Sequence, residues 1–93
     1  MANHLKLSKA LFEWDISGNI VIFSNGDGIR LSATEVVRLS SWLNKRPISE
    51  QLILNQRRFQ MGKKEHLTIL KEGLSIYLST EDTRQLTQWL KSS

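Results

Sequence analysis

Residues 20–43 read IVIFSNGDGIRLSATEVVRLSSWL, and residues 67–90 read LTILKEGLSIYLSTEDTRQLTQWL. In both stretches a short apolar run leads to a turn that contains glycine. A second apolar run, a serine and a periodic stretch ending in tryptophan and leucine follow. The second stretch lies 47 residues after the first, and the match needs no gap. This similarity predicts that one structural unit occurs twice in the chain.

The match extends outward to residues 5–46 and 52–93. Eleven of the 42 aligned positions are identical, whereas unrelated segments would share about two or three. Chance similarity between two amphipathic segments is the alternative, but the identical positions are mostly apolar or turn and cap positions, which a shared structure preserves. We therefore expect residues 1–93 to form a single domain built from two repeats. The identical pairs are Leu5/Leu52, Leu7/Leu54, Phe12/Phe59, Ile22/Ile69, Gly26/Gly73, Ile29/Ile76, Leu31/Leu78, Ser32/Ser79, Leu39/Leu86, Trp42/Trp89 and Leu43/Leu90.

The first repeat predicts three strands followed by a helix. Apolar and polar residues alternate along residues 10–16, and β-branched and aromatic residues fill residues 20–23. The glycines of the following turn supply the positive φ angles that a hairpin requires. Ser32 and Glu35 have the spacing of a capping box, which predicts a helix over residues 33–44.

The second repeat follows the same order, with a hairpin at Glu72-Gly73 and a capping serine at residue 79. Extended segments at 5–7 and 52–54 allow a fourth strand in each repeat. Because a 47-residue half buries little core alone, the halves are expected to share one. The predicted fold is α+β: two tandem β-β-β(-β)-α repeats form an antiparallel sheet system with two helices on one face, related by a pseudo-twofold axis. Trp42 and Trp89 are expected at equivalent places between helix and sheet.

The composition is that of a globular domain, with 40% hydrophobic and 24% charged residues among the 93. The sequence contains no catalytic constellation. The chain has no cysteine, and its two histidines, His4 and His66, lack metal-ligand spacing. The sequence Gly26-Asp27-Gly28 lacks the lysine of a phosphate-binding loop and is interpreted as a hairpin. We expect a non-enzymatic protein with no cofactor and no bound metal.

The sequence contains no apolar stretch long enough to span a membrane. The longest apolar run covers residues 20–23, far short of a membrane span. The first residues lack the apolar core of a signal peptide. These features predict a cytoplasmic protein with no membrane partner.

Basic residues concentrate in one stretch. The whole chain has a net charge of +4, but residues 45–71 alone carry seven basic and two acidic residues, a charge of +5. Basic hairpins beside aromatic or apolar residues such as Phe59 and Met61 are typical of single-strand binding, in which phosphates meet cations and bases meet rings. A generic solubilising surface is the alternative. The basic residues are Lys45, Arg46, Arg57, Arg58, Lys63, Lys64 and Lys71.

Strand alternation predicts an apolar outer sheet face. If Ile20 and Ile22 face the helices, the residues between and after them face away, as do their counterparts in the other strands. Such a face is too apolar for plain solvent surface. It favours either a stacking platform with Arg30 and Arg58 or the interface of a homodimer. Its apolar members are Val21, Phe23, Leu70 and Tyr77.

The stretch Gly28-Ile29-Arg30-Leu31-Ser32, followed by a capped helix over residues 33–43, resembles the end of the unit in the Whirly and positive-cofactor-four group of single-stranded DNA binding regulators. Whirly domains contain a ββββα unit twice. The resemblance implies binding of single strands across the sheet and its hairpins by a dimer or larger assembly. It implies roles for Arg30, Arg57, Arg58, Phe59, Lys63, Lys64 and Tyr77.

The leading hypothesis is a small binding protein for single-stranded DNA or RNA. The alternative is an assembly module that forms a homodimer through Val21, Phe23, Leu70 and Tyr77. The predicted nucleic-acid-binding residues are Arg30, Arg57, Arg58, Phe59, Lys63, Lys64, Lys71 and Tyr77.

Overall fold

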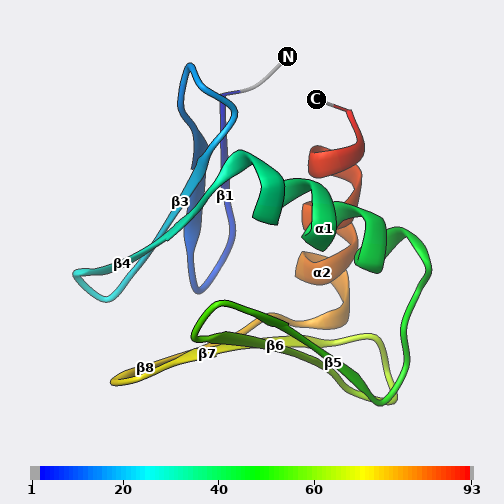
Figure 1. Ribbon diagram of the computed structural model, residues 1–93. Coiled ribbons are helices and arrows are strands. Elements are labelled where there is room, and N and C mark those ends of the chain that lie inside the picture. The colour runs from blue at the N-terminus through cyan, green and yellow to red at the C-terminus, as the bar shows by residue number, and fades with distance from the viewer. Residues whose placement is uncertain (1–2, 93) are drawn as a thin grey trace.

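The computed structural model describes residues 3–92 and contains two four-stranded antiparallel meanders, each followed by a helix (Figure 1). The predicted α+β class and tandem layout are confirmed, and each repeat has the fourth strand. Ser93, the last residue of the predicted second repeat, lies outside the described residues. The first repeat contains β1 (His4–Lys6), β2 (Leu11–Trp14), β3 (Ile20–Ser24), β4 (Asp27–Leu31) and α1 (Ala33–Asn44). The second contains β5 (Glu50–Leu54), β6 (Arg57–Met61), β7 (Leu67–Lys71), β8 (Leu74–Tyr77) and α2 (Thr80–Lys91).

The sequence repeat is also a structural repeat. Strands β3 and β7, and helices α1 and α2, begin and end 47 residues apart. Gly26 and Gly73 occupy equivalent hairpins with φ angles of 77° and 79°, which side chains with a Cβ rarely adopt. In both repeats the hairpin requires a positive φ at this position, and glycine provides it.

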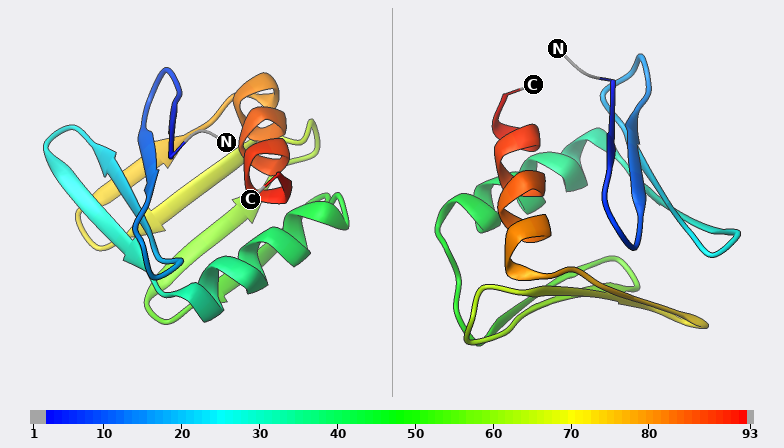
Figure 2. Two further views of the ribbon diagram at one scale, coloured as in Figure 1. Left: turned by 90° about the horizontal axis from the view of Figure 1, so that it is seen from above. Right: turned by 180° about the vertical axis from the view of Figure 1, so that it is seen from behind.

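Each repeat forms its own sheet. The strand orders are β1-β2-β3-β4 in the first sheet and β5-β6-β7-β8 in the second, so strands pair in chain order within each sheet. Helix α1 carries the chain away from the first sheet before β5 begins. The two sheets are inclined to one another, and both helices lie on their inner sides (Figures 1 and 2).

The two repeats share one hydrophobic core between the sheets and the helices. Phe12 and Phe59 hold equivalent positions on the inner faces, and both are fully buried. Trp89 of α2, in the second repeat, packs against two rings of the first repeat. Its ring makes an edge contact with Phe12 at a centroid distance of 6.4 Å, and its centroid lies 5.2 Å from that of the Trp14 ring. Trp42 is only half-buried at the edge of this core, so the two equivalent tryptophans differ in burial.

The helices begin at the predicted serines. The Ser32 hydroxyl accepts from the Glu35 N–H at 3.3 Å, and the Glu35 carboxylate accepts from the Ser32 N–H at 2.9 Å, which completes a capping box. At α2 the Ser79 hydroxyl accepts from the Asp82 N–H at 3.1 Å. The Asp82 carboxylate instead accepts from the Ser8 hydroxyl at 2.8 Å. The second cap therefore connects the two repeats.

Neither helix in residues 3–92 has the length and apolar character needed to cross a membrane.

Candidate nucleic-acid interface

The outer side of the second sheet carries two rows of side chains, which we call the second-sheet face. Cross-strand pairing places a row of polar and aromatic residues beside a second row that contains apolar, basic and polar residues. Their strand neighbours, such as Phe59 and Ile69, point into the core. Alternate residues of each strand thus fill the core, and the residues between them form this outer face. The first row is Gln51, Gln60, Thr68 and Tyr77, and the second is Ile53, Arg58, Leu70 and Ser75.

A polar groove of about 390 Å³ runs along the first row. The amides of Gln51 and Gln60 and the hydroxyl of Thr68 provide both donors and acceptors there. Glu50 adds a carboxylate to the lining. Such a lining suits the edges of unpaired bases, which present donors and acceptors in varied patterns. The lining residues are Ser49, Glu50, Gln51, Gln60, Met61, Gly62, His66 and Thr68.

Two aromatic side chains meet beside this groove: its lining residue His66 and Tyr77. The rings of His66 and Tyr77 lie 5.3 Å apart between centroids, with an interplanar angle of 51°. Tyr77 remains 52% exposed, so much of its surface is open to solvent. A Cβ at position 62 would collide with the His66 ring, and only glycine lets that ring approach the strand end so closely. The pair offers an aromatic surface beside the polar row.

Three cations without an acidic partner lie near the groove. Arg58 is exposed on the second-sheet face, and Lys63 and Lys64 are exposed in the turn between β6 and β7. Within residues 3–92 none of the three forms an ion pair. Their charge is therefore available to a phosphate backbone.

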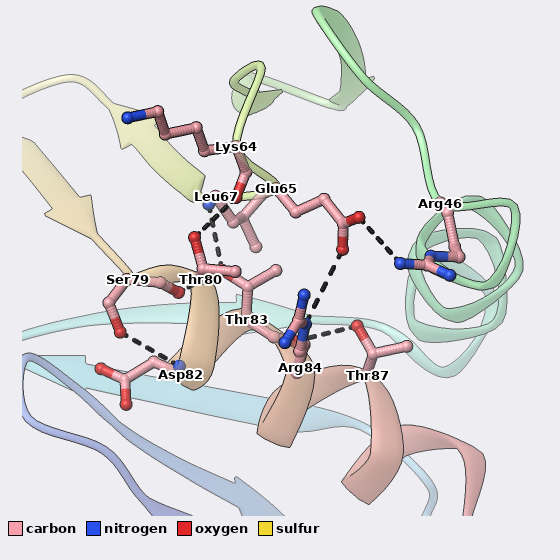
Figure 3. A network of polar contacts seen from close by, with 10 residues as sticks. All are labelled: Arg46, Lys64, Glu65, Leu67, Ser79, Thr80, Asp82, Thr83, Arg84 and Thr87. Atoms are coloured by element: carbon pink, nitrogen blue, oxygen red, sulfur yellow. Dashed lines mark hydrogen bonds and ion pairs between the residues drawn. The ribbon is translucent and has the colours of Figure 1, made fainter.

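The turn that carries the two lysines is fixed to both helices (Figure 3). The Glu65 carboxylate accepts from Arg46, which follows α1, at 2.9 Å and lies 3.9 Å from the Arg84 guanidinium of α2. The Thr80 hydroxyl donates to the Lys64 carbonyl at 2.6 Å. The Lys64 side chain extends away from these contacts. The backbone of the turn that carries the two lysines is thus held by the fold, which lowers the backbone ordering cost of binding.

Phe59 is misplaced in the predicted site. Its side chain is 0% exposed and belongs to the core, so it cannot stack on a base. Arg57 shares its side of β6 because it lies two residues before Phe59, and it pairs with Glu35 of α1 at 3.5 Å. Lys71 similarly points to the inner side of β7 and pairs with Asp27 at 3.6 Å. We leave these three residues out of the candidate site.

Arg30 lies on the outer face of the first sheet, where its charge is balanced by Asp15 at 3.3 Å. The side-chain amide of Asn19, the N–H groups of Asn19 and Ser17, and the charge of Arg30 together outweigh desolvation and lower the pKa of Asp15 below its ordinary value of 3.8. Asp15 therefore stays ionised near neutral pH. Arg30 is thus less available to phosphate than the three unpaired cations.

The predicted apolar interface is divided between two surfaces. Val21 and Phe23 lie on the outer face of the first sheet, whereas Leu70 and Tyr77 lie on the second-sheet face. The prediction places the four on one face because strand alternation alone does not show that the repeats form separate sheets. Val21 and Leu70 are also half-buried. The homodimer stays a prediction, with a smaller continuous apolar area than expected.

Gln51, Gln60 and His66 are groove residues that the sequence interpretation did not select. Gln60 could have been found from alternation, because it follows the buried Phe59 by one residue. His66 could not, since its ring position depends on the turn at Gly62. Within the part of the chain that the structure describes, no group of three or more metal-ligating side chains is present. Comparison with protein-family models, curated proteins and solved structures found no match.

Proposed function

We propose that this protein binds single-stranded nucleic acid across the second-sheet face and performs no chemistry on it. One observation carries the proposal: three unpaired cations lie on or next to the strands that line a polar groove, and the groove residue His66 contacts the exposed ring of Tyr77. Phosphates contact Arg58, Lys63 and Lys64, and a base packs on Tyr77. A cytoplasmic location accords with such a partner.

The arrangement favours single strands over duplexes. A base can lie on the Tyr77 ring only when its own face is free, and a duplex keeps that face stacked inside the helix. The amides of Gln51 and Gln60 reach hydrogen-bonding edges that pairing would occupy. The cations contribute affinity without sequence preference, since every nucleotide carries the same phosphate.

The cations can be tested together by replacing Arg58, Lys63 and Lys64 with glutamine. Each phosphate contact adds about 0.7 to the salt slope of single-strand binding, so the triple variant should reduce that slope by about 2. Affinity at low salt should fall about tenfold or more. Fluorescence anisotropy of a labelled oligothymidine, titrated at several salt concentrations, measures both quantities.

The matched control replaces Arg38, Lys45 and Lys91 with glutamine. These residues are also one arginine and two lysines, are exposed, and form no ion pair within residues 3–92. They lie on or just after the helices rather than on the second-sheet face. Equal losses in the two triple variants would show a general charge effect and reject this site.

A further inference from the structure

A second concave site lies on the helix side of the β6–β7 turn. It is a pocket of about 260 Å³ between the end of α1, the middle turns of α2 and Glu65. Figure 3 shows Arg46, Glu65, Thr83, Arg84 and Thr87 of its lining. Its apolar lining comes from Leu43, Pro47 and Met61. Of these, only Met61 also lines the polar groove. The polar rim consists of Arg46, Glu65, Arg84, Thr87 and Gln88, and buried Thr83 completes the lining.

The rim carries an unbalanced positive charge. Arg46 and Arg84 share the single carboxylate of Glu65, which leaves a net charge of +1. The two arginine side chains remain 70% and 62% exposed, and within the described residues they have no other acidic partner. Each guanidinium has five N–H donors. Several donors therefore remain free to receive one further anion.

Two left-handed backbone positions hold this cluster. Arg46 and Glu65 have φ angles of 52° and 60°, in the left-handed region that disfavours residues with a Cβ. Arg46 occupies the position after a helix end where glycine is typical. The Arg46 N–H donates to the Leu43 carbonyl at 3.0 Å, and the Glu65 N–H donates to the Gly62 carbonyl at 3.2 Å. The helix end and the β6–β7 turn therefore fix the backbone positions from which Arg46 and Glu65 meet.

We propose that this pocket binds a small carboxylate with a short apolar group. The carboxylate accepts N–H bonds from Arg46 and Arg84, whose planar guanidinium groups match its geometry. The apolar group rests on Leu43, Pro47 and Met61. A single negative charge neutralises the rim, whereas a phosphate monoester carries nearly two near neutral pH. The volume, below that of drug-sized sites, requires a small ligand.

This carboxylate has two possible sources: a free organic acid or the C-terminus of a peptide. Both present the same group beside an apolar side chain. The inference does not depend on nucleic-acid binding, because the pocket uses different polar residues. The two proposals can therefore fail separately.

Met61 provides a direct reporter. The chain contains two methionines, Met1 and Met61, so a sample with ¹³C-labelled methionine methyl groups gives a simple spectrum. Titration with isovalerate should shift the Met61 methyl signal saturably. The uncharged isovaleramide should bind at least tenfold more weakly. A Met61 signal that does not move with isovalerate, or moves equally with both probes, would overturn the proposal.

Variants and a peptide arm complete the test. Arg84→Gln should weaken isovalerate binding at least tenfold, and the matched Arg38→Gln, also on an exposed helix surface, should leave it unchanged. Unchanged binding in Arg84→Gln would also overturn the proposal. A short peptide ending in leucine is compared with its C-terminal amide. Stronger binding of the free peptide supports a peptide terminus as source, and a response to isovalerate alone supports a free acid.

Discussion

Replacing Phe59 with alanine is expected to lower the free energy of unfolding by about 3–5 kcal/mol, because the substitution leaves a cavity in the shared core. The Phe59 ring is 0% exposed. Phe12→Ala should cost a similar amount, since Phe12 has the equivalent position in the first repeat and is equally buried. Urea denaturation of the purified variants measures both values.

Phe23→Ala is the matched control. Its ring is 44% exposed on the outer face of the first sheet, and its loss should cost about 1 kcal/mol or less. A loss below about 1 kcal/mol for Phe59→Ala would contradict the core assignment.

Replacing Tyr77 with alanine is expected to weaken single-strand binding by about 1–3 kcal/mol, which is about 5- to 150-fold in Kd. The exposed Tyr77 ring, which contacts the groove residue His66, supplies the stacking surface. Tyr77→Phe keeps the ring and should retain most of the affinity. Anisotropy titrations of the same labelled oligothymidine measure both variants.

Phe23→Ala again serves as control, because it removes an exposed ring from the other sheet. Its affinity for the oligothymidine should match that of the unaltered protein. The reverse pattern, with normal binding in Tyr77→Ala and weak binding in Phe23→Ala, would move the interface to the first sheet. Ultraviolet circular dichroism of each variant checks that the fold is retained.

Local sequence patterns predicted most of the fold. The 47-residue repeat, the hairpin glycines and the capping serines all act over a few residues, so their structural consequences are visible in the sequence. The number of sheets was not visible. Alternation determines which residues point inward, but it does not determine whether strands of the two repeats pair with each other. That choice depends on contacts between distant segments.

The candidate site was predictable only where it depends on strand alternation, and not where it depends on contacts between distant segments. Arg58 and Tyr77 were assigned outward and are exposed. Phe59 was assigned to the site from its basic neighbours, although its match to Phe12 indicated a core position. Arg57 and Lys71 are paired with Glu35 and Asp27 of the other repeat, and such pairs arise only when the repeats pack together.

Fluorine NMR on the single tyrosine tests the central claim most directly. The sequence contains one tyrosine, Tyr77, so biosynthetic 3-fluorotyrosine gives one signal from the proposed stacking residue. We predict a saturable, salt-sensitive shift of that signal with oligothymidine, and a much smaller shift with duplex DNA of equal length. An unchanged signal at low salt would contradict the proposed interface. With no binding in anisotropy it would reject nucleic-acid binding itself, and with saturated binding it would place the interface away from Tyr77.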